Sequence, residues 1–249
     1  MKHSKKSFIN VHPLTYIYLI LSLFVGRIEI YFYSLFIVVI HETAHYMIAK
    51  YFCFEIDQMT ILPFGAYLRL KDMYLHDIKE ELCVILAGPS THLFLYYVIL
   101  ILCDGDRQDY LLTFNSFIFI FNLIPIYPMD GHRIISLLMQ SVFDLKKALY
   151  LSMKLSIFCL CLLSLFYFEL ETFVMIVYLA TSQIQYYKDI PQSLRYVYSH
   201  ITDHHRYKRK IIHRAYHYRR GYQNYYLLND KIYNEKDVVF ELLKNIKNI

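Results

Sequence analysis

The sequence is poor in charged residues, glycine and proline. Charged residues make up 19% of its 249 positions, and there are only six glycines and six prolines. Hydrophobic residues make up 57%, and the mean hydropathy is +0.30. These values are high for a soluble domain of this size. The composition therefore argues against an ordinary soluble domain and favours a membrane protein.

The sequence also lacks paired cysteines. Its five cysteines are Cys53, Cys83, Cys103, Cys159 and Cys161, and no two are spaced as CxxC. Their number is odd, and most lie in or beside apolar segments. This pattern argues against a disulfide framework and favours packing residues in a reducing compartment.

The apolar residues gather in six segments, at residues 14–25, 30–50, 82–102, 110–127, 154–168 and 172–187. Because a spanning helix needs about 20 residues, we expect the first to begin near Val11 and the fifth near Ala148. No small-residue cleavage site follows the first segment, so we expect a retained helix rather than a signal peptide. The sequence predicts an all-α polytopic membrane protein with about six transmembrane helices.

Basic residues concentrate at the C-terminal end. From Lys188 onward there are 13 Lys/Arg against 6 Asp/Glu, or +7, which leaves −2 for the rest of a chain whose formal net charge is +5. By the positive-inside rule, both termini of a six-span protein are then cytosolic. We expect a membrane domain over residues 1–187 and a short, basic cytosolic tail over residues 188–249.

Within this tail, residues 206–220 hold seven basic residues and no acidic ones. We expect a solvated helix that faces the anionic head groups of the lipid bilayer. No nucleic-acid reader motif is present, so direct nucleic-acid binding is not expected. A helix is expected from Glu235 to Lys247, and the tail is too short to form a core of its own.

The second apolar segment contains His-Glu-Thr-Ala-His at residues 41–45. On a helix His41 and His45 share one face and are spaced to bind one zinc ion. Glu42 lies beside them, where a carboxylate can take a proton from zinc-bound water. Ionisable groups at membrane depth are costly and rare without a function. We therefore predict a metal-dependent hydrolytic site with one Zn²⁺ per chain.

A small membrane-associated β-hairpin is expected after this motif. Residues 67–71 alternate, with Leu68 and Leu70 on one face, which is typical of a strand. Pro63 and Gly65 indicate a turn before it. Such a strand can pair with an extended substrate, or it can be a surface hairpin with no substrate role.

The third apolar segment contains Gly88, Pro89 and His92. The first two are expected to kink the helix or to let another helix approach closely. Two interpretations of His92 stay open. Its ring either bonds a backbone carbonyl or lines the active-site cavity.

The fourth segment is interrupted near its end. Pro125 and Pro128 cannot continue a regular helix, and unwound backbone at membrane depth is tolerated only inside protein or beside water. Asp130 follows on this broken segment. It either caps the next helix or completes a three-ligand zinc site with an open fourth position. Its pairing with the histidine motif favours the second interpretation.

The motifs occur in a characteristic order. They are Val11-His-Pro13, Ile40 to His45, Leu62-Pro-Phe-Gly65, Ala87-Gly-Pro89 with His92, and Asn122 to Gly131. Together they resemble the site-2 protease family of intramembrane zinc metalloproteases, and within it the sporulation branch. The resemblance covers about residues 11–190.

The resemblance implies that His41, His45 and Asp130 bind zinc and that Glu42 is the general base. It implies substrate-binding or supporting roles for Asn122, Pro63, Phe64 and Gly65, and we add His92 and Pro128 to that group.

The resemblance further implies a membrane-associated substrate similar to a pro-sigma factor, and inhibitory companion membrane proteins. It places the chain in the bacterial cell membrane, as a multi-pass protein of the outer forespore membrane that can form homo-oligomers. Relatives end in a CBS-type domain, and residues 226–249 resemble its opening strand and helix. Position 132 is His where relatives often have Gly, so His132 either perturbs the site or faces the inner leaflet.

Two other functions fit parts of the pattern. One is a membrane metal transporter or sensor without hydrolysis, which calls for further acidic or histidine ligands on the fifth and sixth segments. The other is a catalytically silent scaffold that binds a partner. The first lacks those ligands and the second leaves four intact catalytic positions without a role, so we prefer the protease.

Overall fold

The structure is a computed structural model that describes residues 9–11, 13–24, 26, 28–62, 65–166, 170–200, 210–213, 217–228 and 230–246. The chain forms two compact units. One contains Met1–Met73 and Glu80–Leu123, and the other contains Tyr74–Lys79 and Ile124–Ile249.

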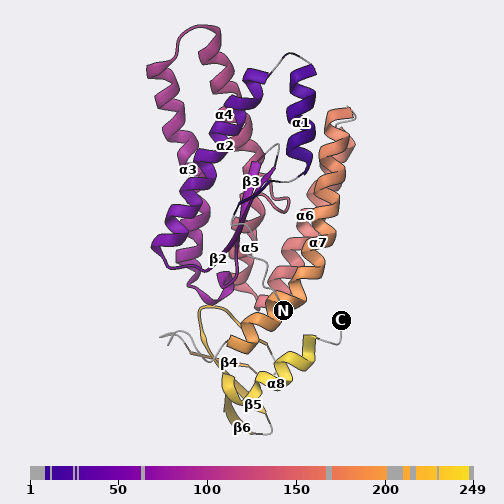
Figure 1. Ribbon diagram of the computed structural model, residues 1–249. Coiled ribbons are helices and arrows are strands. Elements are labelled where there is room, and N and C mark those ends of the chain that lie inside the picture. Colours follow the sequence, from indigo (N-terminus) through magenta and orange to yellow (C-terminus); the bar gives the residue numbers. More distant parts are fainter. Residues whose placement is uncertain are drawn as a thin grey trace, which may run out of the picture. The chain divides into compact units, whose positions relative to one another are not determined.

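The first unit is built on a group of long helices (Figure 1). It holds α1 (Pro13–Phe24), α2 (Ile28–Tyr51), most of α3 (Ile78–Leu102) and α4 (Asp106–Leu123). Helices α2, α3 and α4 pack through a buried apolar cluster of Ile37, Val38, Leu95, Ile99 and Ile118. Other apolar side chains of α3, among them Phe94 and Ile101, are 67% and 80% exposed. Such a surface suits contact with lipid rather than with water.

A three-stranded sheet lies in the same unit. Its strands are β1 (Ile9–Val11), β2 (Ile56–Leu62) and β3 (Gly65–Leu70) in the order β1-β2-β3, with β1 parallel and β3 antiparallel to β2. The expected hairpin is thus present as β2 and β3. Strand β1 was not expected from the sequence, because three residues are too few to show an alternating pattern.

The alternation in β3 has the expected consequence. Leu68 and Leu70 are buried against Ala49 of α2 and Val84 of α3, whereas Arg69 between them is exposed. Burial of this apolar face attaches the hairpin to the helix that carries the His-Glu-Thr-Ala-His motif.

The described part of the second unit contains three long helices, a small sheet and a C-terminal helix. The helices are α5 (Asp130–Val142), α6 (Leu145–Phe166) and α7 (Leu170–His200), and they are followed by β4 (Lys210–His213), β5 (Gln223–Leu228), β6 (Lys231–Asn234) and α8 (Glu235–Ile246). A short 3₁₀ turn, η1 (Met73–Leu75), lies where the two units meet in the sequence. The second sheet has the order β4-β5-β6, parallel and then antiparallel.

Helix α7 is longer than the sixth apolar segment, which ends at residue 187. It continues through Pro191 to His200. Ile190, Leu194 and Val197 recur at helical spacing beyond that end, and all three are buried in one core with Tyr226 of β5 and Leu242 of α8. The continued apolar stripe therefore stabilises the extension despite the proline.

The described part of the basic run contradicts the expected lipid-facing helix. Residues 210–213 form a strand, and Arg220 is only 1% exposed. The Arg220 guanidinium donates to the backbone carbonyl of His76 at 2.8 and 3.2 Å and to Oε1 of Gln140 at 2.9 Å. These acceptors compensate its desolvation, so this arginine ties the tail to the rest of its unit instead of meeting lipid.

Three helical segments of the described chain are long and apolar enough to cross a membrane. They are Tyr31–Tyr51, Ile78–Leu102 and Leu145–Leu165. Helix α1 has 12 residues, or roughly 18 Å of helix, against a hydrocarbon core of about 30 Å. The membrane character of the chain agrees with the sequence analysis, while six spans and cytosolic termini stay predictions.

Candidate metal centre

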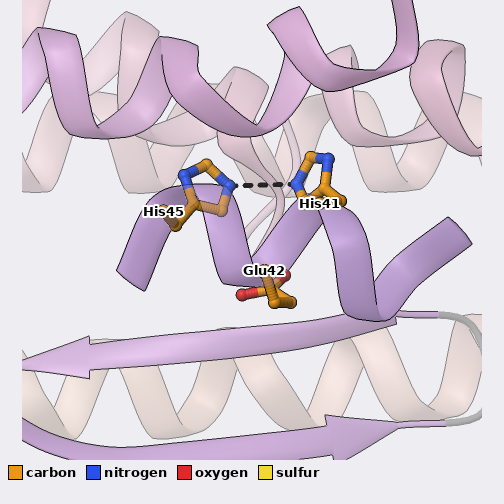
Figure 2. A group of neighbouring side chains, drawn as sticks. All are labelled: His41, Glu42 and His45. Atoms are coloured by element: carbon orange, nitrogen blue, oxygen red, sulfur yellow. Dashed lines mark hydrogen bonds between the residues drawn. The ribbon is translucent and has the colours of Figure 1, made fainter. Parts of the chain in front are cut away.

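His41, Glu42 and His45 lie together on α2. All three are buried, with exposures of 2%, 4% and 2%. The rings of His41 and His45 approach through their Nε2 atoms, 3.0 Å apart, and the ligand atoms of the three residues all lie within 4.8 Å of one another. Figure 2 shows both rings on one side of α2 and the carboxyl group of Glu42 on the side toward the neighbouring strands. This is the arrangement that the spacing of the motif predicts for a helix.

The ring of His45 is oriented by α3. Its Nδ1 lies 2.7 Å from the backbone carbonyl oxygen of Val84. A carbonyl oxygen only accepts, so Nδ1 carries the proton and donates. In the neutral ring, Nε2 then carries a lone pair that is directed at His41.

The ring of His41 is held by a second histidine. His41 Nδ1 lies 2.9 Å from Nε2 of His92, whose Nδ1 lies 2.8 Å from Oδ1 of Asn115. Both outer residues are buried, at 2% and 3% exposure. The partners of the His92 ring are thus side chains, and not the backbone carbonyl that one interpretation expected.

The donor set fits zinc. Imidazole nitrogen and carboxylate oxygen are ligands that Zn²⁺ takes in catalytic sites, where three protein ligands leave one position open. Each histidine ring is held at Nδ1 by a hydrogen bond, which leaves Nε2 to face the metal position. Hydrogen bonds of this kind at the far nitrogen are usual for metal-bound histidines.

Gly88 gives the two rings their space. A Cβ atom built on Gly88 would overlap His45 Nε2 and lie 2.5 Å from His45 Cε1 and 2.6 Å from His41 Cε1. Gly88 is followed by Pro89 inside α3, which runs without a break from Ile78 to Leu102. At Gly88 two side chains of α2 thus approach α3 closely, in agreement with one of the two outcomes expected of this pair.

Asp130 is the first residue of α5, in the second unit. It is 6% exposed, and the N-cap position before it is occupied by Met129, which makes no side-chain capping bond. Asp130 thus does not occupy the capping position that the alternative interpretation gave it.

The segment before Asp130 is held at one residue. The backbone N–H of Tyr127 donates to Ser156 Oγ of α6 at 2.8 Å, and its carbonyl accepts from Gln183 Nε2 of α7 at 3.0 Å. Ser156 in turn donates to Gln183 Oε1 at 2.9 Å. The peptide bond from Tyr127 to Pro128 is cis. Two buried side chains therefore satisfy the backbone where the prolines interrupt the helix.

The other predicted site residues fall in different places. Asn122 is near the end of α4, where its Nδ2 donates to the carbonyl of Ile118 at 3.0 Å. Gly65 begins β3. Pro63 and Phe64 lie outside the described residues.

His132 does not face a leaflet. It is 2% exposed and meets the rings of Tyr127 and Tyr186 edge-to-face, at centroid distances of 5.6 and 5.0 Å. Burial, with a smaller contribution from Arg133, lowers the pKa of His132 to about 3. The ring is therefore neutral near pH 7.

Sequence reasoning missed Asn115, Ser156 and Gln183. Each is a polar residue within an apolar helix, which is the signal that could have found them. Polar residues at membrane depth are expensive and usually functional.

Comparisons with known proteins match the part of the chain that carries this group of residues. Residues 30–105, which carry His41, Glu42, His45, Gly88 and His92, match the model of peptidase family M50. The chain is 34% identical to stage IV sporulation protein FB of Bacillus subtilis over 191 residues, covering 72% of this chain and 66% of the relative. It is 29% identical to a zinc metalloprotease of Methanocaldococcus jannaschii over 119 residues, covering 45% of this chain and 34% of the relative.

A solved structure has the same fold. The site-2 protease from Methanocaldococcus jannaschii superposes with a TM-score of 0.55 at 23% identity, covering 74% of this chain and 89% of that one. The matched part of this chain spans just under two thirds of the first curated relative and about one third of the second. This chain belongs to peptidase family M50.

Proposed function

We propose that this chain is an intramembrane zinc endopeptidase that cleaves a membrane-associated protein near the cytosolic face of the membrane. The observation that carries the proposal is the buried group of His41, Glu42 and His45, with two ring nitrogens 3.0 Å apart. Family membership and the name of the second relative, a zinc metalloprotease, support zinc as the metal.

Glu42 is the proposed general base. A zinc ion held by His41 and His45 would supply a water whose pKa lies near 7 instead of near 16. The buried Glu42 carboxylate would accept a proton from the attacking water and return it to the leaving amine of the cut peptide bond. Because the ligand atoms of His41, Glu42 and His45 all lie within 4.8 Å of one another, the proposal places the scissile bond within reach of all three side chains.

Strand β3 is the proposed docking strand for the substrate. In the described sheet β3 pairs with β2 alone, so one of its edges has no strand partner there. A helical peptide bond is shielded, so the substrate has to unwind locally, and an edge strand can hold the extended segment by main-chain hydrogen bonds.

The proposed substrate is a pro-sigma factor cleaved during sporulation, with companion membrane proteins that restrain the enzyme. The support is the similarity to a stage IV sporulation protein. The test is co-expression of the full chain with tagged, membrane-associated pro-sigma factors. A shortened product is expected with the wild type and none with His41→Ala, which lacks a zinc ligand. Equal product with both would contradict the proposal.

Asp130 is the proposed third zinc ligand, supported by its burial and by its place on the interrupted segment. Asp130→Asn replaces an anionic oxygen by a neutral amide of the same size. We expect zinc retention to fall, with affinity lower by at least about the 10–100-fold typical of a lost supporting residue. Zinc analysis of the purified variant measures this. Full occupancy at limiting free zinc would remove Asp130 from the ligand set.

A further inference from the structure

We infer that His92 and Asn115 are positioning residues that fix which nitrogen of His41 is available to the metal. The inference rests on the proposed zinc site. Neither residue binds the metal in this account, and both act through the ring of His41. The inference follows from the order of donors and acceptors along the chain of contacts.

The first hydrogen bonds in this series are those between Asn115 and His92. Its Nδ2 donates to the backbone carbonyl of His92 at 2.9 Å, which turns its Oδ1 toward the His92 ring. An amide oxygen only accepts, so Nδ1 of His92 carries a proton and donates to it at 2.8 Å. The backbone of α3 thus fixes the orientation of the Asn115 amide, and the amide fixes Nδ1 as the nitrogen of His92 that carries the proton.

The next step sets His41. With the proton on Nδ1, a neutral His92 ring presents a lone pair at Nε2. His41 Nδ1, 2.9 Å away, must then donate. Nε2 of His41 then carries a lone pair. It faces the lone pair on Nε2 of His45, and the two nitrogen atoms are 3.0 Å apart. Two lone pairs at that distance repel each other, and a shared cation removes the repulsion.

The opposite placement of protons along these hydrogen bonds would disable the metal site. If His92 donated from Nε2, His41 would have to accept at Nδ1 and carry its proton at Nε2, where the metal binds. A polar side chain in the place of Asn115 that could only donate would favour that state. The acceptor at position 115 is therefore the feature that commits His41 to metal binding.

We call the hydrogen-bonded series of Asn115, His92 and His41 the relay, and all three side chains are buried. His41, His92 and Asn115 are 2%, 2% and 3% exposed. Within such a site, water is a poor competitor for these hydrogen bonds, and the bonds are stronger than in solvent.

The test measures metal binding on the purified full chain in detergent. Zinc affinity is determined by chelator competition, and Co²⁺ replaces zinc to report coordination geometry through its visible absorption bands. His92→Leu and Asn115→Leu keep apolar bulk but remove the relay. We expect a loss of zinc affinity of about 10–100-fold and altered Co²⁺ bands in both.

Matched variants separate the relay from simple packing. His92→Gln keeps an acceptor for His41 and a donor for Asn115, and Asn115→Asp keeps the acceptor for His92. Both are expected to bind zinc within about tenfold of the wild type, as is Thr113→Ala at an exposed position of α4. Melting temperatures of the metal-free proteins show whether each variant is folded.

The results that overturn the relay are distinct from failure of the site itself. Wild-type zinc affinity and Co²⁺ bands in both leucine variants would overturn the relay. So would a His92→Gln protein that is folded but as weak in zinc binding as His92→Leu. A wild-type chain that binds no zinc would overturn the proposed function, and the relay with it.

Discussion

Gly88→Ala is expected to remove most of the bound zinc from the protein. The added methyl group would occupy the position of His45 Nε2 and press on His41 Cε1, which a Cβ would approach to 2.6 Å. The rings cannot turn aside freely, because His45 is hydrogen-bonded to Val84 and His41 to His92. Overpacking of this kind costs about 1–3 kcal/mol where the surroundings yield. Here the strain falls on the two rings whose nitrogens are the proposed zinc ligands.

The measurement is zinc affinity by chelator competition, together with the melting temperature. We expect affinity to fall by about 100-fold or more, since displaced ligands lose more than the 10–100-fold typical of supporting residues. Ser90→Ala, an exposed position two residues along α3, is the control and should bind zinc like the wild type. Unchanged zinc affinity in Gly88→Ala would show that the rings do not hold the metal at this place.

Glu42→Gln is expected to abolish cleavage and to keep the metal. The carboxamide has nearly the size of the carboxylate but cannot take a proton from water. A positioned general base contributes about 10²–10⁴-fold to the rate, so product should fall by at least that factor. The two proposed histidine ligands are unchanged, and the variant should remain folded. Product formation from a tagged substrate is the measurement, and cleavage at the wild-type rate would exclude Glu42 as the base.

The histidine pair could be predicted because its geometry is local. On a helix, residues four apart share a face, so the sequence alone placed His41 and His45 together and Glu42 beside them. The strand with Leu68 and Leu70 facing inward was predictable for the same reason, since alternation is a local pattern.

His92 marks the limit of such reasoning. Its partners are His41, 51 residues earlier, and Asn115, 23 residues later. Which face of one helix meets which face of another depends on packing, which no local pattern encodes. Gly88 was suspected of allowing close approach, but its neighbours, the rings of His41 and His45, follow only from the structure.

The tail shows how tertiary packing overrides composition. A run of basic residues predicted a solvated helix, yet Arg220 is buried because the carbonyl of His76 and Oε1 of Gln140 accept hydrogen bonds from its guanidinium. Both partners are distant in sequence, so the charge count could not reveal them. The length of α7 was missed for a related reason, since apolar residues of the tail supply the partners of Leu194 and Val197.

The central claim is that one zinc ion at His41 and His45 works with Glu42 to cut a peptide bond. The direct test is to measure bound zinc per chain and product formed on the same purified preparations of wild type and Glu42→Gln. The account predicts one zinc per chain in both and product only in the wild type. Product from Glu42→Gln, or a wild-type protein that cleaves its substrate without zinc, would contradict it.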